Sequence, residues 1–251
     1  MPRFLAGLVS SILIASLLSC STQTSPQHNQ LVVFAAASLK SVFIQIGDRF
    51  KTDNPGVDVT FDFAGSSELA TQLTQGAAAD VFASADNAQM EKVAKAGLLA
   101  GSPTNFASNT LVIVAAPGNP KNINSFADLT RPGLSVVTCQ QPVPCGSATE
   151  RIEDATGVHL KPVSEELSVT DVLNKVTTGQ ADAGLVYVTD ALSAGNKVTA
   201  IKFPQAASVA NVYPIGALKN SSHVSLAQRF VATVTGETGQ QILAQSGFAK
   251  P

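Results

Sequence analysis

Four segments with uncharged polar residues stand where helices are expected to begin: Ser38, Ser66, the loop 139–146 and Ser168-Val169-Thr170. The first turn of a helix carries N–H groups without a carbonyl partner and a partial positive charge. Helix starts therefore bind anions without a cationic side chain, and serine hydroxyls add further donors. Together the segments indicate a site for a small, fully deprotonated oxyanion, which needs no acceptor from the protein. Serine is also a common N-cap, worth about 1 kcal/mol, so purely structural caps are the alternative.

The elements that must position these segments alternate between strands and helices. We expect strands at 31–37, 57–63, 80–84, 111–116, 134–138, 183–188, 198–203 and 212–218, and helices at 39–50, 66–76, 86–97, 147–156, 170–179, 224–235 and 237–245. This alternation predicts an α/β fold with mostly parallel sheets. Ligands bind beyond the carboxyl ends of the strands in such sheets, which is where the polar segments lie.

Motifs for common catalytic chemistry are missing from the sequence: it has no G-x-G-x-x-G, G-x-x-x-x-G-K-[ST], H-E-x-x-H or G-x-S-x-G. A hydrolase that used Ser38 or Ser66 would need a histidine base. His28, His159 and His223 lie away from the predicted strand ends. We therefore predict a binding protein that is not an enzyme, with a serine hydrolase as the alternative from another class.

Composition narrows the class further. The 251 residues include 16 Lys and Arg against 18 Asp and Glu, for a net charge of −2, and 45% are hydrophobic. That apolar fraction supports a sizeable core and argues against disorder. The near balance of charge, without a basic run, excludes a nucleic-acid partner. The overall composition also excludes a polytopic membrane protein.

The N-terminus is typical of an export signal. A single Arg3 precedes an apolar stretch with small residues, so residues 1–19 are predicted to be a signal peptide. The sequence Leu17-Leu18-Ser19-Cys20 resembles the bacterial lipoprotein cleavage box, in which the cysteine is lipidated. Residues 20–30 would then be the lipidated cysteine and a flexible tether, and the protein would be anchored to the outer face of the cytoplasmic membrane. An ordinary secretory signal with an incidental cysteine is the alternative.

The remaining cysteines form an even pair. With Cys20 lipidated, Cys139 and Cys145 are left in an oxidising compartment, where a disulfide is expected. Closing so short a loop stabilises the fold by about 2 kcal/mol in the chain-entropy model. Two free, buried thiols are the alternative.

Several motifs in the mature chain resemble those of the molybdate-binding proteins of ABC importers. They are VFAAASL at 33–39, FAGSSELA at 63–70, GAAADVFASAD at 76–86 and AGLVY at 183–187. The similarity extends from residue 31 to residue 248, with the motifs in family order.

The resemblance implies a periplasmic-binding-protein type II fold, in which two α/β lobes close on a ligand cleft around a hinge. The first lobe would comprise 31–113 plus 216–251, and the second 114–215. The chain would cross between them near 109–116 and 212–218.

The resemblance also implies a ligand set. Ser38 and Ser66 would each give a hydroxyl and a backbone N–H, Cys145 and Val169 a backbone N–H, and Tyr187 its hydroxyl. The metal would be held as an oxyanion, with no metal ion ligated directly and no cofactor. A disulfide-forming cysteine at 145 departs from the family, where a small apolar residue is usual, but the donor there is the main chain.

The implied function is high-affinity binding of molybdate, with tungstate also expected, and delivery to the permease and ATPase of an ABC importer by a monomeric protein. Discrimination against sulfate would come from cavity size, because Mo–O bonds are longer. A binding protein for another tetrahedral oxyanion such as sulfate is the alternative.

Overall fold

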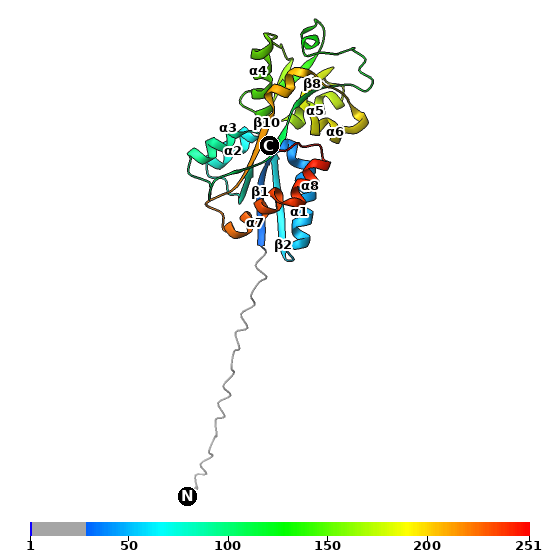
Figure 1. Cartoon of the computed structure of the whole chain (residues 1–251). Helices are drawn as coiled ribbons and strands as arrows, with labels where there is room; N and C mark the ends of the chain where they lie inside the picture. The colour runs from blue at the N-terminus through cyan, green and yellow to red at the C-terminus, as the bar shows by residue number, and fades with distance from the viewer. Residues whose placement is uncertain (2–28) are drawn as a thin grey trace.

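The computed structural model describes Met1 and residues 29–251. Figure 1 shows two lobes, one containing residue 29 and the C-terminal helices and the other the middle of the chain. The predicted signal peptide 1–19, Cys20 and most of the tether lie outside the described residues. The last two residues of the predicted tether, Asn29 and Gln30, pair with Val57 and Asp58 of strand β2 (Val57–Ala64).

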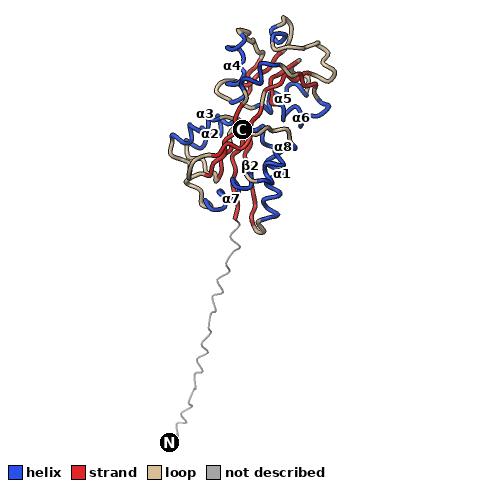
Figure 2. Tube along the Cα trace, in the orientation of Figure 1, coloured by secondary structure: helices blue, strands red, loops and turns tan. Residues whose placement is uncertain are grey.

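Each lobe is built on one five-stranded sheet, drawn in red in Figure 2. The first lobe's sheet has the order β2 (Val57–Ala64), β1 (Asn29–Ala36), β3 (Val81–Ala83), β10 (Asn211–Ala217) and β4 (Thr104–Asn109). The second lobe's sheet has the order β7 (Ser164–Glu166), β6 (Val136–Cys139), β8 (Ala183–Tyr187), β5 (Leu111–Ala115) and β9 (Thr199–Ile201). This two-sheet arrangement is the α/β fold with two lobes that the sequence predicts.

The helices cover these sheets. Those of the first lobe are α1 (Lys40–Asp53), α2 (Ser66–Thr74), α3 (Asn87–Lys95), α7 (Val224–Thr235) and α8 (Glu237–Gln245). Those of the second lobe are α4 (Pro144–Thr156), α5 (Val169–Thr177) and α6 (Val188–Ala194). Short 3-10 turns complete the described chain at η1 (Ala37–Leu39), η2 (Ala127–Thr130), η3 (Gly195–Lys197) and η4 (Pro204–Val209). None of the helices in the described part is long and apolar enough to cross a membrane.

The chain passes from the first sheet to the second through Thr110, between β4 and β5. It returns between β9 and β10, so that Asn211 is already in the first sheet. These changes of sheet lie a few residues before the predicted lobe limits of 114 and 216. Two crossings of this kind are where a hinge between the lobes would act.

The sheets are mostly parallel, as predicted, but both are mixed, because one strand in each sheet runs against the other four. β1 is parallel to β2 and β3, but β10 is antiparallel to β3 and β4. Likewise β6 is parallel to β7 and β8, whereas β5 is antiparallel to β8 and β9. A parallel neighbour requires a crossover connection. The strands β5 and β10 instead enter their sheets from the other lobe, so they are free to run in the opposite direction.

The helix predicted at 147–156 begins three residues earlier, at Pro144. Proline lacks an N–H and has a fixed φ, which suits the first turn of a helix. As a result Cys145 lies in the first turn of α4 rather than in the preceding loop.

The two lobes have different cores. In the first, the ring of Phe43 lies 5.9–6.3 Å from the rings of Phe61, Phe106 and Phe230, measured between centroids. The second core is mainly aliphatic, with Phe126 stacked on Phe203. Each fully buried side chain of this size stabilises the fold by about 1.5–3 kcal/mol. Each lobe therefore has a core of its own against which its helix starts are fixed.

Candidate functional site

One pocket is lined by all five residues that the resemblance singles out: Ser38, Ser66, Cys145, Val169 and Tyr187. The rest of its lining is apolar and consists of Ala36, Ala37, Ala64, Gly65, Ala85, Val143 and Pro144. About 200 Å³ of space in and at the mouth of the pocket is not filled by protein atoms, and part of it is open to solvent. Both lobes contribute, and no charged side chain lines the pocket. Polar groups at this site are therefore hydroxyls and main-chain groups.

Helix starts surround the pocket. Ser66 and Val169 are the first residues of α2 and α5, and Cys145 is the second residue of α4. Ser38 lies in the turn η1 that leads into α1. The N–H groups in such first turns have no carbonyl partner in their own helix, and each helix start has a partial positive charge. The arrangement gives a small anion donors from several directions.

Two residues of the predicted segment 168–170 do not line the pocket. The Ser168 hydroxyl serves as the N-cap of α5: it accepts from the Asp171 N–H at 3.3 Å and donates to the Asp171 carboxylate at 2.7 Å. Thr170 lines a separate groove outside the pocket. For Ser168 the structural interpretation of a helix-start serine is therefore the correct one.

The Ser66 hydroxyl is held from the first lobe. Its oxygen accepts a hydrogen bond from the Ala85 N–H at 3.0 Å. Since a backbone N–H can only donate, the hydroxyl hydrogen of Ser66 is available to another acceptor.

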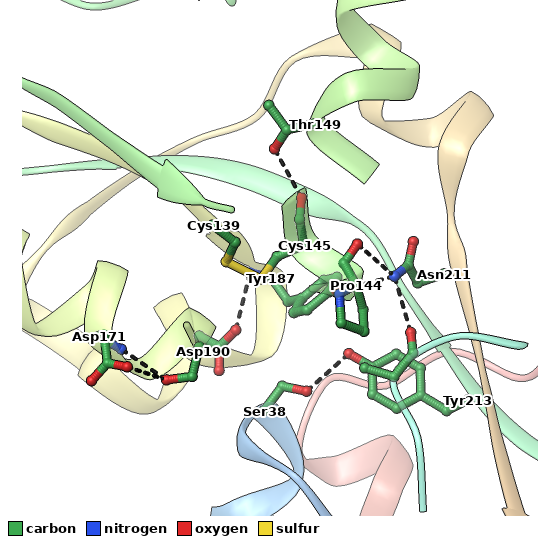
Figure 3. Close-up of a disulfide and its surroundings, with 12 residues drawn as sticks. Ser38, Cys139, Pro144, Cys145, Thr149, Asp171, Tyr187, Asp190, Asn211 and Tyr213 are labelled. Carbon is green, nitrogen blue, oxygen red and sulfur yellow. Dashed lines mark hydrogen bonds between the residues drawn. A yellow bond between two sulfur atoms is a disulfide. The ribbon is translucent and has the colours of Figure 1, made fainter. Parts of the chain in front are cut away.

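The Tyr187 hydroxyl is held by Asn211, a residue that sequence reasoning did not identify (Figure 3). The Asn211 amide nitrogen donates to the Tyr187 hydroxyl at 2.8 Å, and it also lies 2.9 Å from the Ala85 carbonyl and 3.3 Å from the Pro144 carbonyl. The Asn211 amide oxygen accepts from Arg151 at 2.8 Å. This one side chain links the first lobe, the start of α4 and a pocket hydroxyl.

The second residue missed by sequence reasoning is Tyr213, on β10. Its hydroxyl lies 3.0 Å from the Ser38 hydroxyl, and its ring packs edge-on to that of Tyr187. The chain has only two tyrosines. A tyrosine whose ring is buried in a strand needs a partner for its hydroxyl, and its place in the predicted strand 212–218 is the signal that could have drawn attention to Tyr213.

Burial controls the protonation of the groups around the pocket. It raises the pKa values of Tyr187 and Tyr213 well above the usual tyrosine value, so both hydroxyls keep their protons. Burial also raises the pKa of Asp190 to about 7, although the hydrogen bond from the Tyr187 N–H opposes this shift. The Tyr187 N–H lies 3.0 Å from the Asp190 carboxylate.

A disulfide links the end of β6 to the first turn of α4. Cys139 and Cys145 are bonded, with their Cα atoms 5.6 Å apart, and Figure 3 shows the bond beside Tyr187. The loop that the disulfide closes is tightly packed. A β-carbon on Gly146 would lie only 2.3 Å from the Gln140 carbonyl oxygen, so a side chain does not fit there. The Thr149 hydroxyl also donates to the Cys145 carbonyl at 2.9 Å. The position of the Cys145 N–H is therefore fixed covalently and by packing.

The lobes touch beside the pocket. The Gln89 side chain of the first lobe donates to the Pro142 carbonyl of the second at 3.0 Å. A β-carbon on Gly65 would lie 2.2 Å from the Leu167 carbonyl oxygen, so this approach leaves no room for a side chain at position 65.

A metal-ion site is not part of this arrangement: within Met1 and residues 29–251, no three His, Cys, Asp or Glu side chains group so that they could hold a metal ion. The hydroxyl and N–H donors of the pocket suit an anion instead.

The sequence matches known proteins over nearly its whole length. The family model for bacterial extracellular solute-binding proteins matches residues 31–249. The chain is 70% identical to the molybdate-binding protein ModA of Mycobacterium tuberculosis, covering 98% of this chain and 97% of that protein. It is 30% identical to ModA of Escherichia coli, covering 88% of this chain and 89% of that protein.

Solved structures share the fold. The periplasmic molybdate-binding protein of Azotobacter vinelandii matches with a TM-score of 0.78 at 23% identity, covering 88% of this chain and 99% of that one. The sulfate-binding protein SubI of Mycobacterium tuberculosis matches with a TM-score of 0.77 at 20% identity, covering 89% and 87%. At these low sequence identities the two matches support only the two-lobed fold.

Proposed function

The chain belongs to the family of bacterial extracellular solute-binding proteins, and on this premise we propose that it binds molybdate outside the cytoplasm for uptake by an ABC importer. The observation that carries the proposal is a pocket lined by helix starts and hydroxyls from both lobes. The 70% identity to a ModA protein over nearly the whole chain supports molybdate as the solute. Members of this family bind and deliver solutes, and the proposed role includes no catalysis and no cofactor.

The proposed ligands are the five pocket residues. Ser38 and Ser66 donate through a hydroxyl and an N–H each, Cys145 and Val169 donate through the main chain, and Tyr187 donates through its hydroxyl. Hydrogen bonds to a charged group contribute about 1.5–3 kcal/mol each. Binding also costs several kcal/mol, because the ligand loses its freedom of motion. A handful of such hydrogen bonds exceeds this cost by enough to give nanomolar affinity, about −12 kcal/mol.

The proposal includes motion of the two lobes about the crossings near Thr110 and before Asn211. An anion that contacts both lobes stabilises the closed arrangement, because it satisfies donors on each side at once. A permease with its ATPase would receive the anion from this closed form.

Residues 1–20 supply the proposed location. With 1–19 as a signal peptide and Cys20 lipidated, the protein would be a monomeric lipoprotein on the outer face of the cytoplasmic membrane. This proposed location predicts that the mature protein begins with a lipid-modified Cys20. Mass spectrometry of the protein purified from the membrane fraction tests that prediction.

Sulfate is the second candidate ligand. A pocket of donors does not separate sulfate from molybdate by charge, and a sulfate-binding protein shares the fold. The size of the cavity must then determine whether molybdate or sulfate binds more tightly, since the molybdate tetrahedron is larger than that of sulfate. Tungstate is close in size to molybdate, so we expect it to bind with similar affinity.

Thermal melts of the chain from Ser21 onwards test the proposal, because this form keeps every helix and strand described. Molybdate, tungstate, sulfate and phosphate are compared in parallel. A ligand at about 1,000 times its Kd stabilises by about 4 kcal/mol, which for a protein of this size raises the Tm by about 8–16 °C. We expect this shift with molybdate and tungstate. A shift with sulfate alone would move the function to the second candidate, and no shift with any oxyanion would contradict both.

A further inference from the structure

Two of the three pocket hydroxyls have their hydrogen-bond direction fixed by the protein. The Ser66 oxygen accepts from a backbone N–H, that of Ala85. The Tyr187 oxygen accepts from the amide nitrogen of Asn211. The orientation of this amide is settled by its partners, because its nitrogen faces two carbonyls and its oxygen faces a guanidinium, which can only donate.

A hydroxyl whose oxygen already accepts a hydrogen bond has its own hydrogen left to give. In Ser66 and Tyr187 that hydrogen is available to a ligand in the pocket that both residues line. Both hydroxyls are thus arranged as donors before any anion arrives.

The third hydroxyl, that of Ser38, contacts the Tyr213 hydroxyl at 3.0 Å, and either oxygen could be the donor of that bond. If Ser38 donated to Tyr213, its lone pairs would face the anion and repel it. If Tyr213 donates, Ser38 keeps its hydrogen for the anion, as the other two residues do.

We propose that Tyr213 is a positioning residue that donates to Ser38, and that it thereby makes the pocket select oxyanions without a proton. This inference rests on the proposed function, because it takes Ser38 to be a ligand of the anion. Tyr213 itself does not line the pocket. Its ring is fully buried and packs edge-on against Phe106, Tyr187 and Phe248.

The consequence concerns sulfate and hydrogen phosphate, which are tetrahedral dianions of similar size. Hydrogen phosphate carries one hydroxyl, which needs an acceptor from the protein, and sulfate carries none. Size does not separate these two anions, so a difference in their binding reports on the proton alone. Three hydroxyls fixed as donors leave hydrogen phosphate without a side-chain acceptor in the pocket.

Tyr213→Phe tests the proposal because it removes one oxygen and keeps the ring packing. Released from Tyr213, the Ser38 oxygen can accept as well as donate. We expect molybdate affinity, measured by titration calorimetry on the chain from Ser21 onwards, to fall about 3- to 10-fold. In competition against molybdate, the preference for sulfate over hydrogen phosphate is expected to fall at least about tenfold.

A double-mutant cycle with Ser38→Ala shows whether Tyr213→Phe lowers affinity through the Ser38 hydroxyl or through a general loss of structure. The loss caused by Tyr213→Phe should disappear when Ser38 is already alanine. Thr235→Val is the matched control, since it removes a first-lobe hydroxyl that donates to the Val231 carbonyl, away from the pocket. It should leave affinity and selectivity unchanged.

The outcomes distinguish this inference from the proposed function. If Ser38→Ala binds molybdate as tightly as the wild type, the proposed ligand set is wrong. The inference alone is overturned if Ser38→Ala binds weakly while Tyr213→Phe matches the wild type. It is also overturned if Tyr213→Phe lowers affinity equally in both backgrounds, or if hydrogen phosphate fails to compete with Tyr213→Phe at concentrations where sulfate does.

Discussion

The two lobes contribute different kinds of groups to the pocket. The first lobe offers serine hydroxyls, from Ser38 in the turn after β1 and from Ser66 at the start of the helix after β2. The second lobe offers the main chain of Cys145 and Val169, together with the hydroxyl of Tyr187. In the proposed site the first lobe therefore depends on side-chain identity, whereas the second depends mainly on where its helices begin.

The frameworks behind these groups differ in the same way. The first lobe holds its serine hydroxyls through hydrogen bonds, between Ser66 and the Ala85 N–H and between Ser38 and Tyr213. The second lobe adds a covalent link, the Cys139–Cys145 bond, next to the main-chain donor that it positions. We therefore expect substitutions at the first-lobe serines to change mainly the affinity for the anion, and substitutions at the second-lobe disulfide to change mainly the stability of the fold.

The largest effect is expected from Ser38→Ala combined with Ser66→Ala. Two hydrogen bonds to a charged ligand are lost, so molybdate affinity should fall at least about 100-fold in titration calorimetry. The unfolding free energy should fall by about 1–3 kcal/mol at most, because the Ala85 N–H loses its acceptor. Ser67→Ala is the control: Ser67 follows Ser66 on α2 but does not line the pocket. An unfolded double variant would show that these serines are structural caps.

Replacing both cysteines, Cys139→Ser with Cys145→Ser, should have the opposite effect, with a clear loss of stability and only a small loss of affinity. The unfolding free energy should fall by about 2 kcal/mol, because the unfolded chain is no longer cross-linked. Molybdate affinity should fall less than about tenfold, since the N–H of residue 145 belongs to the main chain. Reducing agent gives a second comparison, with an effect on the wild type and none on the variant. A loss of affinity as large as that of the serine pair would contradict the contrast between the lobes.

Asp190→Asn should show an effect that depends on pH. Burial raises the pKa of Asp190 from 3.8 to about 7, so the folded protein binds a proton there that the unfolded chain releases. The wild type should therefore lose stability as the pH rises from about 4 to about 7, and the asparagine variant should not. Urea unfolding of both proteins across this range measures the difference, which should be small near pH 4 and largest above pH 7. A difference that does not change with pH would contradict the role given to burial.

The smallest effect on binding is expected from Val169→Ala. Its N–H remains at the start of α5, so molybdate affinity should stay within about threefold of the wild type. The buried side chain makes the change visible in chemical unfolding, as a loss of about 1–2 kcal/mol. Binding that weakened as much as in Ser38→Ala would mean that the Val169 side chain, and not its main chain, forms the site.

Local patterns predict most of the fold. The long apolar or alternating runs correspond to β1, β2, β5 and β10, and the helical spacing of apolar residues corresponds to α1, α7 and α8. The predicted N-cap of α3 is confirmed, because the Asp86 side chain accepts from the Gln89 N–H at 2.9 Å. Strand direction is not a local property, which is why the mixed sheets were not predicted.

The limits at the candidate site have a similar cause. Ser38 and Ser66 stand out by residue type after a predicted strand, and Cys145 and Val169 lie in segments predicted as helix starts. The resemblance alone gives the main-chain donor roles of Cys145 and Val169, and it alone names Tyr187. Asn211 and Tyr213 were missed because their partners lie far away along the chain. Asn211 contacts Tyr187, 24 residues away, and Tyr213 contacts Ser38, 175 residues away. Hydrogen bonds across such separations arise from the pairing of the lobes and leave no periodic pattern in the sequence.

The central claim is that one anion is held by donors from both lobes and by no charged side chain. A crystal structure of the chain from Ser21 onwards with tungstate, located by its anomalous signal, tests it most directly. We predict the oxyanion within hydrogen-bonding distance of the hydroxyls of Ser38, Ser66 and Tyr187 and of the N–H groups of Cys145 and Val169. An anion bound elsewhere, or one held by a cationic side chain such as Arg151, would contradict the account.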